Sequence, residues 1–215
     1  MADRKQSALY RLVCTVWQGT GNLRDKYLRK GSDFSYWMEQ KEAGFSEEQG
    51  GRYQPSPAFM TMDAMKHLSI TPDDSIIDVG CGKGAAMYYM AKFPFGKVGG
   101  VDLSQKLTEI ANDNFRRLGL AKCHADCADA TKYKGLDDFN YIYMFNPFPE
   151  QIMKGAMANL LESLERKPRK CTIVYAHPVC HSYIVRNTPF RLVDQKKRLI
   201  DWFDVYYYEY DPSLK

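Results

Sequence analysis

Apolar positions in this chain alternate between short continuous runs and runs at helical spacing. The continuous runs, which predict buried strands, lie at residues 76–79, 97–101, 121–125, 138–145 and 171–176. The helically spaced runs lie at residues 58–68, 85–92, 104–118 and 152–164. Strands that alternate with helices predict an α/β fold with a largely parallel sheet. Two β-prone stretches, 190–197 and 202–210, predict two final strands.

The first fifty residues show a different pattern. Helical spacing predicts three helices there, at residues 6–17, 22–30 and 33–40. Gly19 and Gly21 are expected to end the first of them, and the polar, glycine-rich stretch 44–51 is typical of a hinge. We therefore expect residues 1–50 to form a helical cap, either fixed or a mobile lid, on a main domain of residues 51–215.

Residues 75–102 carry the densest chemical signals. A strand leads into Gly80, Gly82 and Gly84, and a helix and a second strand follow, ending on Asp102. This order is typical of a nucleoside-binding βαβ unit. Glycines let a ligand lie against the main chain, and the helix N-terminus adds free N–H groups. A carboxylate at the end of the second strand can bind both ribose hydroxyls.

The full string D-V-G-C-G-K-G at residues 78–84 resembles motif I of the class I methyltransferases, which use S-adenosylmethionine. Gly80, Gly82 and Ala85 also satisfy the G-x-G-x-x-A spacing of a dinucleotide site, so the alternative enzyme is an NAD(P)-dependent oxidoreductase. The two predicted final strands favour the methyltransferase, because the sheet of that family ends in a hairpin whose last strand is antiparallel, and a common dehydrogenase fold does not. The resemblance implies a Rossmann-like seven-stranded sheet whose last strand is antiparallel, with the N-terminal helices added as a cap.

The resemblance also implies which residues bind the cofactor. On the loop and the strand after it these are Asp78, Gly80, Cys81, Gly82, Gly84, Asp102 and Leu103. Asp102 would hold the ribose, and the glycine loop would lie under the methionine and the ribose. Asp78 would help to order the loop and the amino group of the cofactor.

Two more segments complete the implied cofactor site. Asp129 and Ala130 best match the Gly-Asp-Ala triplet that contacts adenine in many class I methyltransferases, with Asp126 as the other candidate. The string R-Y-x-P-S, followed by a helix that Ser56 is expected to cap, resembles bacterial methyltransferase-like proteins distantly similar to the non-SET histone lysine methyltransferases. Tyr53 would then lie near the methionine end of the cofactor; otherwise it is an ordinary loop aromatic.

Asn146, Pro147 and Phe148 follow the fourth strand, where open α/β sheets place their chemistry. The string N-P-F-P resembles the N-P-P-F/Y motif of methyltransferases that act on planar amines, except that Phe148 replaces the second proline. The Asn146 side-chain oxygen and the Pro147 carbonyl could accept N–H bonds from an attacking amine, and an aromatic face could stabilise its growing positive charge. Asn146 is therefore a candidate for both acceptor and cofactor contacts; the alternative is a simple turn.

His177 follows the fifth strand and titrates near neutrality, so it is a candidate general base. The alternative is a neutral loop histidine. Together with Cys180 and His181 it could suggest a metal site, because His and Cys are common metal ligands. The spacing matches no complete set of four ligands, so we expect no bound metal.

The composition of the chain excludes few classes of binding partner or substrate. The chain has 215 residues, six scattered cysteines and a net charge of +4. Scattered cysteines and the lack of a signal peptide or a membrane span predict a cytoplasmic protein. The acceptor is not identified; a small molecule or a protein amine is favoured over nucleic acid, because the basic run 166–170 has no aromatic interleaving. A cofactor-binding protein without transferase activity is the third possibility.

Overall fold

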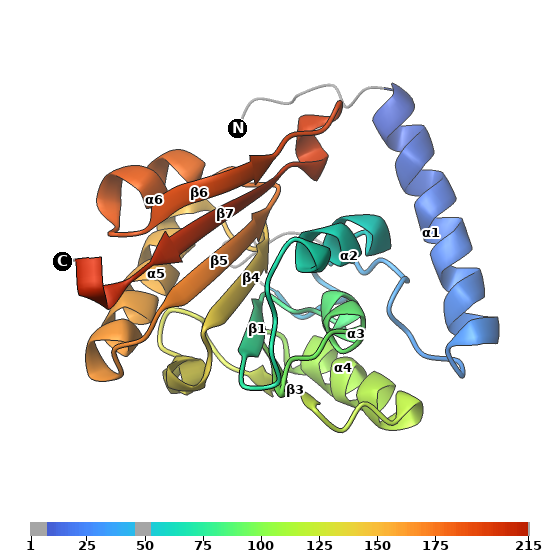
Figure 1. The fold of residues 1–215 in the computed structure, drawn as a ribbon. Coiled ribbons are helices and arrows are strands. Elements are labelled where there is room, and N and C mark those ends of the chain that lie inside the picture. Colours follow the sequence, from blue (N-terminus) through green and yellow to red (C-terminus); the bar gives the residue numbers. More distant parts are fainter. Residues whose placement is uncertain (1–7, 46–52, 215) are drawn as a thin grey trace.

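Parallel strands with helices on both sides form most of the structure, which a computed structural model describes for residues 8–45 and 53–214 (Figure 1). The strands are β1 (Ser75–Val79), β2 (Lys97–Asp102), β3 (Cys123–Cys127), β4 (Tyr141–Phe145), β5 (Cys171–Ala176), β6 (Arg191–Lys196) and β7 (Val205–Tyr210). They form one sheet in the order β3-β2-β1-β4-β5-β7-β6. β7 pairs antiparallel with β5 and β6, and the other neighbours are parallel. The predicted seven-stranded sheet with an antiparallel last strand is confirmed.

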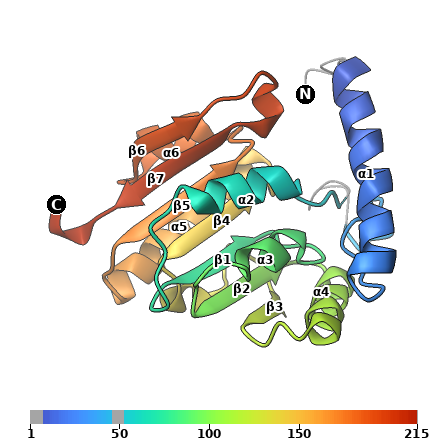
Figure 2. The same ribbon diagram turned by 45° about the vertical axis from the view of Figure 1, so that its right-hand side comes forward.

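Helices cover both faces of this sheet. They are α1 (Ala8–Leu28), α2 (Ala58–Lys66), α3 (Ala85–Met90), α4 (Gln105–Leu118), α5 (Glu150–Arg166) and α6 (His181–Asn187). Figure 2 shows α2, α3 and α4 on one face and α5 on the other. Successive strand residues point to opposite faces, so Ile76 is buried in the core with α2, α3 and α4, and Ile77 in the core with α5 and α6. Burial on both faces explains why the central strands are continuous apolar runs.

The N-terminal segment differs from the sequence prediction in two ways. α1 continues through Gly19 and Gly21, so the predicted break and the separate second helix are wrong. The predicted helix at 33–40 is also absent, and this stretch bends instead, with a single bridge between Met38 and Tyr53. The physical reason lies in Asp25, whose carboxylate accepts the backbone N–H groups of Phe34 and Ser35 at 3.0 and 2.6 Å. Those N–H groups therefore bond to a distant side chain rather than to a helix of their own.

Smaller differences concern element boundaries. Pro57, not Ser56, is the residue before α2. β3 starts at Cys123, two residues later than predicted, and short 3₁₀ turns at 134–138 and 201–203 take up the beginnings of the predicted fourth and last strands. α6 was not predicted. Ser104 caps α4 as expected, because its Oγ accepts the N–H of Leu107, and Gly119 ends that helix.

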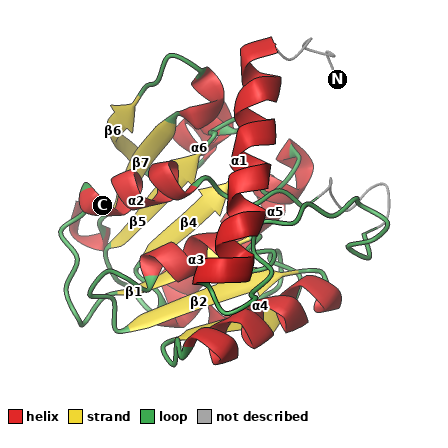
Figure 3. Cartoon of the chain, turned by 90° about the vertical axis from the view of Figure 1, so that its right-hand side faces the viewer, coloured by secondary structure: helices red, strands yellow, loops and turns green. Residues whose placement is uncertain are grey.

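α1 lies outside the layers that pack on the sheet, and its C-terminal end reaches α3 and α4 (Figures 1 and 3). At that end Arg29 pairs with Asp25 at 2.7 Å and donates to the hydroxyl of Tyr89 in α3. The backbone N–H of Asp33 donates to Asn114 of α4 at 2.8 Å. Among the described residues no helix is apolar and long enough to cross a membrane.

Candidate active site

A cavity of about 410 Å³ opens at the carboxyl ends of β1, β2, β4 and β5. Its volume falls in the range of about 300–1,000 Å³ that is usual for small-molecule sites. Most of the predicted site residues line it: Tyr53, Gly80, Gly82, Asp102, Leu103, Asp129, Ala130, Asn146, Pro147, Phe148 and His177. The carboxyl edge of a parallel sheet therefore gathers segments that are far apart in the sequence into one site.

The glycine loop between β1 and α3 forms the floor of the cavity. Gly80 and Gly82 have φ angles of 82° and 52°, in the left-handed region that favours glycine. A Cβ atom at Gly82 would overlap the ring of Tyr53, and one at Gly80 would overlap Pro147. The two missing side chains therefore allow Tyr53 and Pro147 to approach the loop closely.

Asp102 joins this loop to the start of α4. Its Oδ2 accepts the backbone N–H of Gly82 at 2.9 Å, and its Oδ1 accepts that of Ser104 at 2.9 Å. Burial raises the pKa of Asp102, while the two N–H groups oppose that rise. Each carboxylate oxygen keeps a second lone pair, so the group can still accept hydrogen bonds from a ligand in the cavity.

The loop after β3 separates the two predicted adenine acids. Asp129 lines the cavity, and its Oδ1 accepts the N–H and the hydroxyl of Thr131 at 2.9 and 2.7 Å. Asp126 instead accepts the hydroxyl of Tyr133 and pairs with His124, and it does not line the cavity. The geometry thus gives Asp129, rather than Asp126, access to a ligand.

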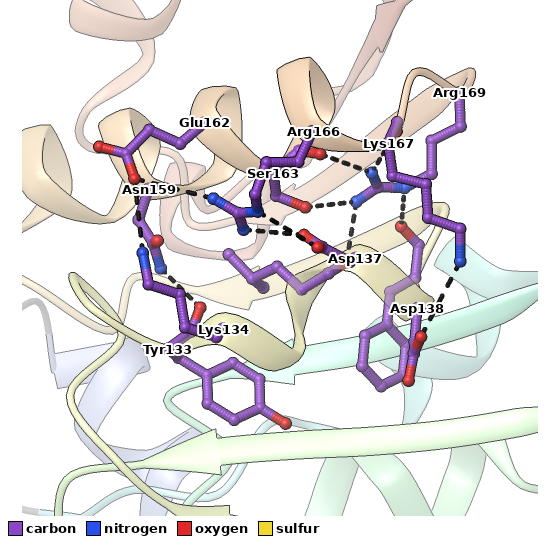
Figure 4. A network of polar contacts seen from close by, with 12 residues as sticks. Tyr133, Lys134, Asp137, Asp138, Asn159, Glu162, Ser163, Arg166, Lys167 and Arg169 are labelled. Carbon is purple, nitrogen blue, oxygen red and sulfur yellow. Dashed lines mark hydrogen bonds and ion pairs between the residues drawn. The ribbon is translucent and has the colours of Figure 1, made fainter.

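Asn159 of α5 is hydrogen-bonded to the end of this loop (Figure 4). Its Nδ2 donates to the carbonyls of Ala130 and Tyr133 at 3.0 and 2.9 Å, and the residue is 2% exposed. In the same network Arg169 donates to the carbonyl of Leu136 and to the hydroxyl of Ser163, so it fixes the following 3₁₀ turn against the end of α5. Buried side chains therefore set the position of the loop that carries Asp129.

Asn146 and His177 occupy equivalent positions after β4 and β5. Both have positive φ angles, 37° and 50°, in the left-handed region, which asparagine and histidine enter more often than most residues. The N–H of Asn146 donates to the carbonyl of Ala176 at 3.1 Å, and the N–H of His177 donates to that of Asp204 at 2.8 Å. These bonds hold both residues in the cavity wall despite a strained backbone.

Three predicted site residues lie behind the cavity wall: Asp78, Cys81 and Gly84. Asp78 and Cys81 are 3% and 4% exposed. Burial and the nearby carboxylate of Asp102 raise the pKa of both groups, that of Asp78 to about 8. Gly84 has a φ of 78° at the start of α3, where a Cβ atom would overlap the ring of Phe115. These residues contribute to the shape of the loop rather than to its surface.

Lys83 was not singled out from the sequence, although it lies inside the glycine motif. Its side chain is fully buried, and its Nζ pairs with Asp33 at 2.7 Å and donates to the carbonyl of Tyr36 at 3.1 Å. The Nζ also lies 5.4 Å from the ring centroid of Tyr53. Burial lowers the pKa of Lys83, and Asp33 opposes the shift. The N-terminal segment thus supplies the counter-charge of the glycine loop.

Sequence reasoning also missed part of the cavity wall: Phe45, Gln54, Val101, Leu107, Ala128, Thr131, Phe145, Ile152 and Trp202. Thr131 could have been found as the partner of Asp129, since Asp-x-Thr turns are common. The sequence around Trp202 and Phe45 does not indicate that they line the cavity. Trp202 lies just before β7 and Phe45 lies in the N-terminal segment, and only the folded chain places them in the same cavity as the glycine loop.

The comparisons with known proteins agree with this geometry. Residues 76–167, from β1 to the end of α5, match a family model described as a methyltransferase domain. The matched segment contains the glycine loop, Asp102 and Asn146, so the resemblance covers the residues that line the cavity from β1 to the start of α5. A solved RNA methyltransferase from Salinibacter ruber, in complex with S-adenosyl-L-homocysteine, shares the fold with a TM-score of 0.54 at 17% identity, over 74% of this chain and 94% of that chain.

Two curated relatives have different acceptors in their names. The 23S rRNA (uracil(1939)-C(5))-methyltransferase RlmD of Xanthomonas oryzae pv. oryzae is 28% identical over 142 residues, covering 62% of this chain and 31% of that protein. Phosphoethanolamine N-methyltransferase 1 of Arabidopsis thaliana is 26% identical over 137 residues, covering 61% and 27%. The chain matches less than half the length of either relative. Both relatives are named as methyltransferases, and the narrower resemblance to the non-SET group stays a prediction.

The buried carboxyl of Asp78 is expected to make stability depend on pH. Its pKa is 3.8 in an exposed setting and about 8 here. Between these values folding requires Asp78 to take up a proton, so the folded state loses stability as the pH rises. Asp78→Asn should therefore gain in Tm relative to wild type between pH 5 and pH 8, measured by thermal denaturation. Asp73→Asn, at an exposed carboxyl, is the control. Parallel curves for wild type and Asp78→Asn would contradict the assignment.

Asn159→Leu should weaken S-adenosylhomocysteine binding, because the carbonyls of Ala130 and Tyr133 lose their donor and the loop loses its fixed position. We expect a loss of about fivefold in affinity, measured by calorimetry. The matched control is Asn112→Leu, which removes two similar bonds to Ala125 in β3. Both variants should lose stability, but only Asn159→Leu should lose affinity; an equal loss in both would assign Asn159 a general packing role.

Proposed function

We propose that the protein transfers a methyl group from S-adenosylmethionine to an acceptor nucleophile. The observation that carries the proposal is the shared cavity, which Asp102 and the glycine loop line together with Asn146 and His177. One set of residues fits a nucleoside and the other fits the handling of an acceptor. A single cavity that joins the two is what direct transfer requires.

For the cofactor, the proposal assigns a role to each group of residues that lines the cavity. Asp102 would accept the two ribose hydroxyls, and Leu103 would pack beside them. The loop from Gly80 to Gly82 would lie against the methionine part. Asp129 and the N–H of Ala130 would bind the adenine ring. Tyr53 already donates its hydroxyl to the carbonyl of Phe34 at 2.7 Å, so its ring would support the loop rather than bind through the oxygen.

The acceptor half concerns the residues after β4 and β5. When bound, the cofactor supplies a methyl group on a positively charged sulfur atom. Asn146 Oδ1 and the Pro147 carbonyl would accept N–H bonds of an attacking amine, and the ring of Phe148 would lie near its developing charge. His177 would take the proton that the nitrogen loses as the new carbon–nitrogen bond forms and the sulfur keeps the electron pair of the broken bond.

The third part of the proposal concerns the class of acceptor. A small molecule or a protein amine fits the cavity better than nucleic acid. The cavity volume of about 410 Å³ is that of a small-molecule site and supports this choice, although one relative is named as an rRNA enzyme and another as a phosphoethanolamine enzyme. An NAD(P)-dependent oxidoreductase is disfavoured by the antiparallel β7 and by the family match. A binding protein without transfer would leave Asn146 and His177 without a role.

We further propose that residues 1–50 form a cap on a methyltransferase domain of residues 51–215. The bonds from Arg29 to Tyr89, from Lys83 to Asp33 and from Ser104 to the carbonyl of Ala43 support a fixed cap over residues 25–45. The predicted hinge lies mostly at 46–51, outside the described residues.

S-adenosylhomocysteine should bind the purified protein with micromolar affinity in a calorimetric titration, and NAD should not. Asp102→Asn should weaken that binding by about 1–3 kcal/mol, because it removes the charge from a buried hydrogen-bonded group. Asp113→Asn, at an exposed carboxyl of α4, is the control and should bind normally. Binding of NAD alone, or unchanged affinity in Asp102→Asn, would refute the proposed cofactor site.

Asn146→Ala should leave S-adenosylhomocysteine affinity nearly unchanged and slow methyl transfer by about a hundredfold or more, since an acceptor contact is lost in the transition state. The measurement is transfer of labelled methyl from S-adenosylmethionine to small molecules of a cell extract. Asn146→Gly separates the side chain from the strained backbone and should be as slow. If both variants lose binding and transfer together, Asn146 is a structural residue.

A further inference from the structure

Three of the rings that line the cavity form one aromatic wall, because Trp202 lies against both Phe145 and His177. Among the described residues that line the cavity, only Asp102 and Asp129 carry a formal charge, and both belong to the proposed cofactor side. The acceptor side therefore offers flat apolar surfaces and a few neutral polar groups.

Trp202 is the central ring of this wall. Its ring centroid lies 5.0 Å from that of Phe145 and 5.1 Å from that of Phe203, in edge-to-face arrangements with interplanar angles of 90° and 89°. The imidazole of His177 lies 5.3 Å away at 37°. An aromatic ring held by three neighbours loses little freedom when a ligand packs against it, so it is well suited to binding another flat ring.

Charge decides between a flat neutral ligand and a cation. The proposed methyl donor carries a positive sulfur, and the acceptor must lie against it for transfer. A cationic acceptor would place two like charges side by side in a partly buried cavity, which is costly unless a carboxylate compensates. Asp102 lies in the cofactor half, bonded to Gly82 and Ser104. His177, beside Trp202, would add to the repulsion if protonated.

We propose that the acceptor is an uncharged, flat aromatic small molecule that stacks on Trp202. This inference rests on the proposed function, because it takes the other half of the cavity to be filled by the cofactor. Trp202 is then a residue that determines acceptor specificity, while Asn146 and His177 handle the nucleophilic atom. Phosphate-rich acceptors such as RNA are disfavoured, since the described acceptor wall carries no lysine or arginine to bind them.

The test uses the full chain saturated with S-adenosylmethionine, because the positive sulfur on which the charge argument depends is absent from S-adenosylhomocysteine. Indole, quinoline and aniline serve as neutral ring probes, choline as a cationic probe and a short single-stranded RNA as a polyanionic one, all by calorimetry at pH 8. At least one ring probe should bind, while choline and RNA should not. Trp202→Leu should reduce ring binding at least about tenfold, the scale of a lost stacking contact, and Trp202→Phe should retain part of it.

The control variant is Phe59→Leu. Phe59 is 50% exposed and packs edge-to-face on Phe203 at 5.2 Å, and neither ring lines the cavity. It should bind the ring probes like wild type. Failure of every ring probe, binding of choline or RNA in their place, or ring binding that Trp202→Leu leaves unchanged would overturn the inference while S-adenosylmethionine still binds. Failure of S-adenosylmethionine itself to bind would instead overturn the proposed function.

Discussion

The carboxylate of Asp102 is the interaction on which the site depends. Its two oxygens accept N–H groups from the glycine loop and from the residue that caps α4, so one side chain links the end of β2 to both segments. Burying an ionisable group is costly, and two N–H donors offset that cost. The carboxylate is therefore oriented before any ligand arrives. Losing it would alter the loop as well as the contact, which is why a conservative amide change is more informative than truncation.

Local signals in the sequence predicted most of the fold, because continuous apolar runs, helical spacing and the Ser104 cap are short-range properties. The glycine motif and Asp102 were found for the same reason. The bend at 33–40 could not be predicted, since it depends on the buried carboxylate of Asp25. Trp202 was missed because its position depends on how β6 and β7 pair, a long-range property. The proposed acceptor wall around Trp202 thus includes a residue that the sequence did not reveal.

Asn146 and His177 are two residues with a strained backbone at the carboxyl edge of the parallel strands, where the cavity lies. Each follows a neighbouring strand, and each has a left-handed backbone that a buried sheet tolerates only because hydrogen bonds to Ala176 and Asp204 restrain it. The first of these bonds links the end of β4 directly to the residue before His177. The two proposed acceptor-handling groups are therefore coupled through the backbone, and a shift in one would be felt by the other.

The ion pair between Lys83 and Asp33 has a consequence for how such domains recombine. A lysine with no exposed surface requires a partner, and here the partner lies fifty residues earlier, in a segment that contributes no strand to the sheet. A chimaera that joined this sheet to a foreign N-terminal segment would bury an ammonium group without its counter-charge, directly beneath the glycine loop. Lys83 and Asp33 would have to be exchanged together, so the smallest interchangeable unit is larger than the sheet and its covering helices.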